Sequence, residues 1–226
     1  MPFHHIRVGR TARYHQTGVD GAPVRELWFA LHGYSQLAER FAATLRALDD
    51  GATAIVVPEA LSRFYLETGL DGHHGDRVGA SWLTREDRDQ DLEDHLAYLD
   101  LLASQVTERL DHKPRVGVLG FSQGSVMAAR WALRGAVLPD RLVLWGASLP
   151  GDVEPRALAD RLGSCPIELV AGDRDPFVPE NSIEAAAHDL RACGASANAS
   201  RFSGGHLIAP LALLRAAGRS DLPLTS

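Results

Sequence analysis

Five consecutive residues, Gly120-Phe121-Ser122-Gln123-Gly124, place a serine between two glycines. They follow the short apolar run 116–119, which predicts a buried strand, and they precede residues 125–133, which predict a helix. A serine on so sharp a turn stands above the sheet with its hydroxyl exposed, and the glycines leave room for neighbouring backbone. The first amides of the helix point at the same spot. The pattern therefore predicts a nucleophilic serine at Ser122.

A serine hydroxyl needs a base, and that base needs a carboxylate to orient it. In a parallel sheet such groups converge at the carboxyl ends of the strands. His206 follows the predicted strand 197–202, and two aspartates, Asp173 and Asp175, follow the predicted strand 167–171. We favour Asp175 as the partner of the histidine because it lies farther past the strand, and we expect Asp173 to brace the turn. The order serine, aspartate, histidine is that of the α/β-hydrolase fold.

Ester attack also creates an oxyanion, which needs two backbone N–H donors. The amide of Gln123 is one candidate because it directly follows the serine. The other is the amide of Tyr34, in the loop after the predicted strand 27–31, where Gly33 allows a close backbone approach. His32 is expected to be a structural hydrogen-bonding residue behind this loop.

The elements that must position these groups alternate along the chain. Apolar strand-like runs alternate with helical segments, which predicts a mostly parallel central sheet flanked by helices. Further strands are expected at 54–57 and 142–145, a weak strand or hairpin within 3–15, and helices at 37–48, 86–110, 155–162, 180–193 and 206–217, with a capping-box-like start at 84–87. Residues 58–83 show no clear period, and a loop this long inside a compact domain is usually functional or partly structured. We expect residues 1–226 to form a single domain.

Bulk composition excludes several classes of protein. The chain has 226 residues and a formal net charge of −6, without a basic run, which argues against nucleic-acid binding. No apolar stretch is long enough to span a bilayer, and no secretory signal is visible, so stable membrane insertion is not expected. Cys165 and Cys193 do not make a disulfide framework, and a cytoplasmic location is the expectation. A homodimer is plausible because homodimers are common, but no surface patch identifies one.

The segment 71–76 contains the adjacent histidines His73 and His74. Adjacent histidines seldom face one ion, and the spacing fits no standard zinc pattern. We therefore expect a polar loop here, and no metal or cofactor.

Four motifs together carry a family resemblance. They are Leu31-His32-Gly33, Gly120-Phe121-Ser122-Gln123-Gly124, the turn 172–179 with two aspartates and two prolines, and Gly205-His206. In this order they resemble the phospholipase/carboxylesterase family, which includes acyl-protein thioesterases and small bacterial carboxylesterases. The resemblance implies an α/β-hydrolase fold with a minimal cap, a triad of Ser122, Asp175 and His206, and oxyanion donors at Tyr34 and Gln123. Residues 34–39 depart from the glycine- and aspartate-bearing stretch common in that family, so the resemblance leaves the substrate open.

Several aromatic and aliphatic side chains could line a pocket for an acyl or alcohol group. The candidates are Phe64, Tyr65, Trp82, Trp145 and Leu149, although core packing is an equal alternative for such residues. The leading hypothesis is a serine carboxylesterase that cleaves a small-molecule ester or thioester through an acyl-enzyme on Ser122. The alternatives are a lysophospholipase, an acyl-protein thioesterase, and a non-catalytic binding protein of hydrolase-like fold.

Overall fold

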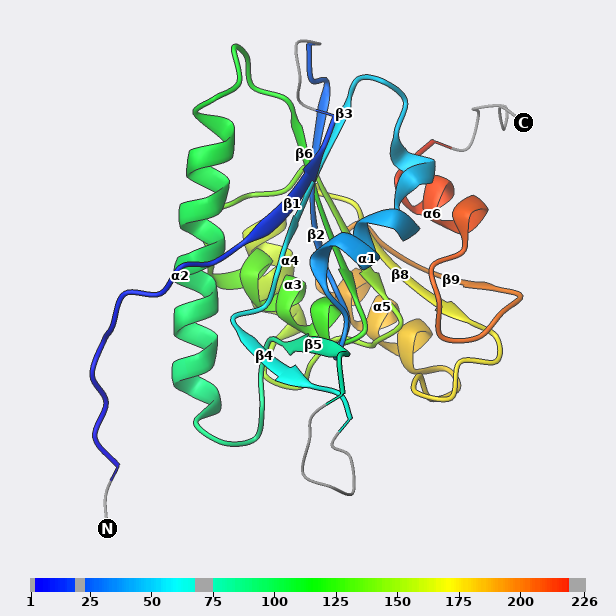
Figure 1. The fold of residues 1–226 in the computed structure, drawn as a ribbon. Coiled ribbons are helices and arrows are strands. Elements are labelled where there is room, and N and C mark those ends of the chain that lie inside the picture. Colours follow the sequence, from blue (N-terminus) through cyan, green and yellow to red (C-terminus); the bar gives the residue numbers. More distant parts are fainter. Residues whose placement is uncertain (1–2, 19–22, 68–74, 220–226) are drawn as a thin grey trace.

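The computed structural model describes residues 3–18, 23–67 and 75–219 (Figure 1). Within these ranges, a seven-stranded sheet has the order β1-β3-β2-β6-β7-β8-β9. Its strands are β1 (Tyr14–Thr17), β2 (Glu26–Leu31), β3 (Thr53–Pro58), β6 (Arg115–Phe121), β7 (Arg141–Trp145), β8 (Ile167–Gly172) and β9 (Ala197–Phe202). Strand β1 is antiparallel to β3, and all other neighbours in this sheet are parallel. The mostly parallel sheet predicted from the sequence is confirmed.

Helices cover both faces of this sheet (Figure 1). They are α1 (Ala38–Thr44), the 3-10 helix η1 (Arg46–Leu48), α2 (Arg88–Thr107), α3 (Gln123–Arg134), α4 (Pro155–Leu162), α5 (Ser182–Ala192) and α6 (Pro210–Ala216). Helices α2 to α5 pack against one face, and α1, η1 and α6 pack against the other. Strand β2 contributes side chains to the hydrophobic core on each face of the sheet. Phe29 and Leu31 face the first group of helices, while Trp28 and Ala30 face the second. Burial on two faces explains why this strand is a continuous apolar run.

A small hairpin lies outside the main sheet. Strands β4 (Ser62–Tyr65) and β5 (Val78–Ser81) pair antiparallel, with Ser62 opposite Ser81. The segment 58–83, whose sequence shows no clear period, is thus partly structured, and the hairpin itself was not predicted. Gly79 obscures the pattern, because a Cβ at this position would lie 2.6 Å from the carbonyl oxygen of Ser35. A glycine is needed here because the loop that carries Ser35 approaches closely, and a glycine also makes the sequence look less like a strand.

Three element boundaries also differ from the prediction. Helix α2 begins after Asp87, whose left-handed φ of 52° and uncapped side chain rule out the capping box expected at 84–87. Within the segment 3–15, only the last two residues belong to a strand. The closing helix α6 begins at Pro210, so His206 lies in the loop that precedes it.

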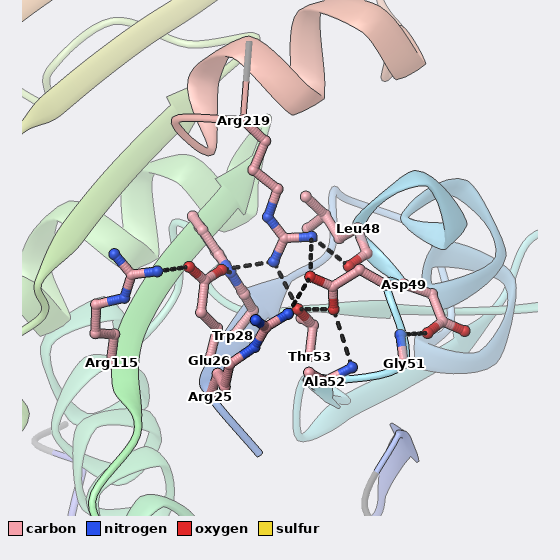
Figure 2. Close-up of polar contacts among 11 residues, drawn as sticks. Arg25, Glu26, Trp28, Leu48, Asp49, Gly51, Ala52, Thr53, Arg115 and Arg219 are labelled. Atoms are coloured by element: carbon pink, nitrogen blue, oxygen red, sulfur yellow. Dashed lines mark hydrogen bonds and ion pairs between the residues drawn. The ribbon is translucent and has the colours of Figure 1, made fainter. Parts of the chain in front are cut away.

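An ionic network at the amino-terminal edge of the parallel strands holds the end of α6 (Figure 2). The buried guanidinium of Arg219 donates hydrogen bonds to the Leu48 carbonyl oxygen at 2.6 Å, to Thr53 Oγ1 at 2.6 Å and to Glu26 Oε2 at 2.5 Å. Arg115 donates to the other oxygen of Glu26 at 2.5 Å. Burial would raise the pKa of Glu26, but the hydrogen bonds that it accepts lower the pKa below its ordinary value. The network therefore ties the segment after α6 to the starts of β2 and β3.

Candidate active site

Ser122 occupies a strained turn between β6 and α3. Its φ of 54° and ψ of −118° are rare for a residue with a side chain. A Cβ at Gly120 would collide with the carbonyl oxygen of Gly124, and a Cβ at Gly124 would collide with that of Leu31. The Ser122 amide donates to the Trp145 carbonyl oxygen at 2.7 Å, which fixes the turn to β7. This is the geometry of a nucleophile elbow.

An aspartate and a histidine form a hydrogen-bonded pair near this serine. His206 Nδ1–H donates to Asp175 Oδ2 at 2.7 Å. The Asp175 side chain is only 1% exposed, and its other oxygen accepts the Phe177 amide at 2.9 Å. Because Nδ1 is engaged by the carboxylate, Nε2 is the nitrogen left to act as a base.

The histidine ring lies beside the serine turn. Its centroid is 4.7 Å from that of Phe121, the residue before Ser122, and Phe177 packs edge-on against it at 4.8 Å. Gly146 makes room for the ring, because a Cβ there would lie 2.9 Å from His206 Cε1. No Ser122–His206 hydrogen bond occurs among the described residues, and catalytic hydrogen bonds of this kind often tighten only in the substrate complex.

Asp173 has a different contact from Asp175. Its Oδ1 accepts the Gly204 amide at 2.9 Å, and its carboxylate lies 4.0 Å from the Arg174 guanidinium. The Arg174 amide also donates to the Gly204 carbonyl oxygen at 2.9 Å. Asp173 thus braces the loop that carries His206, while Asp175 contacts the imidazole itself.

The two expected oxyanion donors lie on the loop after β2 and at the start of α3. In the part of the chain that the structure describes, neither the Tyr34 amide nor the Gln123 amide donates a hydrogen bond. The amides of the adjacent residues Ser35 and Ser122 do donate, to the carbonyl oxygens of Ala80 and Trp145. Two donors are therefore available next to the serine turn, as an oxyanion hole requires.

The expected pocket residues divide into exposed and buried groups. Tyr34 is 57% exposed and stacks on the half-buried Phe64 at 5.2 Å, and Tyr65 is 53% exposed. Trp82 and Trp145 are fully buried and offer no surface to a substrate, and the half-buried Leu149 packs on the core.

Sequence reasoning missed two apolar side chains at the histidine. Phe177 is 72% exposed, and Leu207 is 50% exposed. Leu207 directly follows His206, and Phe177 lies two residues after Asp175. This closeness to predicted catalytic residues was the signal that could have identified them. Exposed apolar groups at such a position commonly contact a ligand.

Two further expectations concern metals and membranes. The described residues contain no group of three histidine, cysteine, aspartate or glutamate side chains that could hold a metal ion. Most of the segment 71–76, including His73 and His74, lies outside the described residues. Among the described helices, none has the length and apolarity needed to cross a membrane.

The parallel sheet and the serine elbow at its carboxyl edge define an α/β-hydrolase. The family model of the FSH1 serine hydrolases matches residues 25–212, so the chain belongs to the FSH1 serine hydrolase family. The predicted resemblance to serine hydrolases of this fold is thereby confirmed. A comparison with curated protein sequences gives no significant match.

Solved structures with similar folds carry esterase and thioesterase names. Esterase PE8 is 23% identical with a TM-score of 0.68, over 92% of this chain and 97% of that one. A phospholipase/carboxylesterase from Dyadobacter fermentans is 16% identical with a TM-score of 0.62, over 92% and 96%. Acyl-protein thioesterase 2 from Zea mays is 20% identical with a TM-score of 0.62, over 88% and 94%. At these identities the likeness supports the fold.

Proposed function

We propose that this serine hydrolase cleaves carboxylic esters through an acyl-enzyme on Ser122, with His206 as base and Asp175 as its orienting carboxylate. The observation that carries the proposal is the 2.7 Å hydrogen bond between Asp175 and His206, next to a serine with φ of 54°. A carboxylate on Nδ1 fixes the tautomer whose Nε2 can accept the serine proton.

The reaction proceeds in two halves. As Ser122 Oγ bonds to the ester carbonyl carbon, its proton passes to His206 Nε2, and the carbonyl oxygen takes the negative charge. The amides of Tyr34 and Gln123 donate hydrogen bonds to that oxygen. The bond to the alcohol oxygen then breaks, the alcohol leaves with the proton from His206, and an acyl-enzyme remains. Water attacks this ester with His206 as base, which releases the carboxylic acid and restores Ser122.

The apolar rim of the site favours an ester with a hydrophobic acyl or alcohol group. Phe177 packs on the His206 ring, Leu207 follows it in the chain, and Tyr34 of the proposed oxyanion loop stacks on Phe64. We expect p-nitrophenyl butyrate to be cleaved at least as well as the acetate. A rise in kcat/KM through long-chain esters would instead support a lysophospholipase, and faster turnover of palmitoyl thioesters would support an acyl-protein thioesterase, as the name of the maize structure suggests.

The decisive experiment compares two serines three positions apart. Ser122→Ala should lower kcat on p-nitrophenyl butyrate by roughly 10⁴-fold or more. Ser125→Ala is the matched control, because Ser125 Oγ is buried without a hydrogen-bond partner in the described residues and its loss should leave kcat unchanged. Wild-type turnover by Ser122→Ala would refute the proposal. Folded protein that is not labelled at Ser122 by a fluorophosphonate probe would favour a non-catalytic binding protein.

We also propose a cytoplasmic location and a homodimer. Two free cysteines, Cys165 and Cys193, suit a reducing compartment, and burial raises the pKa of the Cys165 thiol to about 11, which keeps it unreactive. Light scattering of the purified protein tests the dimer, and cell fractionation tests the location.

A further inference from the structure

Trp82 connects the two loops that carry the oxyanion donors. Its indole Nε1–H donates to the His32 carbonyl oxygen at 2.8 Å, on the loop that leads to Tyr34. Its main-chain amide donates to Gln123 Oε1 at 2.9 Å, on the residue after the nucleophile. The side chain is fully buried, so the indole bond does not compete with water. One residue therefore spans both halves of the proposed oxyanion hole.

Two neutral histidines hold the Trp82 ring between them. His32 lies 5.1 Å from it and His95 lies 5.2 Å from it, measured between ring centroids. Each histidine donates from Nδ1 to a backbone carbonyl, at 2.8 and 2.7 Å, and accepts a backbone amide at Nε2. Those amides belong to the consecutive residues Ala60 and Leu61, at 3.1 and 3.0 Å. Burial lowers the pKa of both histidines, that of His95 to about 4, which keeps both acceptors in place.

The hairpin that leads to Trp82 is bonded to the same loops. The Ser35 amide donates to the Ala80 carbonyl oxygen at 2.9 Å, and the Ala80 amide donates to the Gln36 carbonyl oxygen at 3.2 Å. Gln123 Nε2 donates to the Leu83 carbonyl oxygen at 2.7 Å, just beyond Trp82. Residues 80–83 thus contact the loop after β2 on one side and the start of α3 on the other.

We propose that Trp82 is a positioning residue that fixes the separation and direction of the two oxyanion donors. The inference rests on the proposed function, because it assigns a role to Trp82 only if Tyr34 and Gln123 stabilise an oxyanion. Any buried tryptophan needs an acceptor for its indole N–H, but that acceptor need not lie on the loop that leads to an oxyanion donor. Here both of its N–H groups are used, one on each loop, and oxyanion stabilisation depends steeply on donor position.

Trp82→Phe tests this by removing the indole N–H while keeping an aromatic ring between the two histidines. With p-nitrophenyl butyrate we expect kcat to fall about tenfold or more, because the loop that leads to Tyr34 loses the indole hydrogen bond to the His32 carbonyl oxygen. KM should change by less than about twofold, because the donors act mainly on the transition state. Trp131→Phe is the matched control: this ring is 1% exposed and its Nε1 donates to Asp100 Oδ1 of α2 at 2.7 Å, away from both oxyanion donors.

The control separates positioning from stability. Trp131→Phe should lower Tm to a similar extent while kcat stays at the wild-type value. Should Trp82→Phe not fold, the isosteric residue β-(3-benzothienyl)alanine at position 82 removes the same N–H with less change of shape. An unchanged kcat in the folded variant, a change in KM alone, or an equal loss of kcat in Trp131→Phe would overturn the inference. Activity that survives Ser122→Ala would instead overturn the proposed function, so the two failures are distinguishable.

Discussion

Acidification should destabilise this protein through one buried histidine, His95. Its side chain is buried on α2 against Trp82, and burial lowers its pKa from 6.5 to about 4, partly offset by the hydrogen bond to the Asp91 carbonyl oxygen. The folded protein keeps this imidazole neutral, whereas the unfolded chain binds a proton at the ordinary pKa. Stability is therefore full above the unfolded pKa and is lost as the pH falls from there toward the folded pKa. The shift corresponds to about 3 kcal/mol in the free energy of unfolding.

The assay is urea denaturation from about pH 7.5 to about pH 4.5, for the wild type and for His95→Gln. Glutamine can accept the Leu61 amide and donate to the Asp91 carbonyl oxygen, as His95 does, but it does not titrate. Protonation of acidic groups whose pKa is lowered also destabilises the folded protein in acid, but it does so equally in the wild type and the variant. The wild type should therefore lose about 2–3 kcal/mol more than the variant over this range.

A second histidine provides the control for this experiment. His188 is exposed on α5, so His188→Gln should keep the wild-type dependence of stability on pH. Parallel curves for the wild type and His95→Gln would refute the reasoning, because they would mean that His95 is protonated as easily in the folded state as in the unfolded chain.

Three further substitutions test the site and the fold. Asp175→Asn should lower kcat by roughly 10²–10⁴-fold with little change in Tm, because His206 loses its orienting carboxylate; ester hydrolysis and thermal melting check this. Gly146→Ala should lower kcat even at temperatures well below its Tm, since its Cβ would lie 2.9 Å from the His206 ring and its φ is +67°. A wild-type kcat would contradict this placement of the ring. Arg219→Met should lower the free energy of unfolding by about 2–3 kcal/mol, since Glu26 loses a buried partner; kcat at a permissive temperature should not change, and an unchanged denaturation midpoint would show that the pair contributes nothing.

The sheet could be predicted from the sequence because its strands are buried on both faces. Runs such as 27–31 and 54–57 carry no competing period, and their order with the intervening helices specifies parallel pairing. The site residues were predictable for a related reason. Ser122, Asp175 and His206 each follow a strand, and parallel strands bring such positions to one edge.

What could not be predicted depends on contacts between distant segments. Strands β4 and β5 are four residues each, and Gly79 is required by its approach to Ser35, which no local pattern reveals. The aromatic content of the chain also does not say which rings face solvent. Trp82 was therefore expected in the substrate pocket, whereas it lies beneath the loops, between histidines that are 63 positions apart in numbering, His32 and His95.

The anchoring of Arg219 has a practical consequence for protein engineering. The guanidinium fixes the chain at the sheet edge where β2 and β3 begin, whereas Ser122 follows the opposite end of β6. A reporter, affinity tag or solid support joined to the chain beyond Arg219 would therefore be anchored at the sheet edge opposite to the serine turn. Immobilised preparations attached in this way should keep their reactive face open to the medium, provided that Arg219 itself is retained.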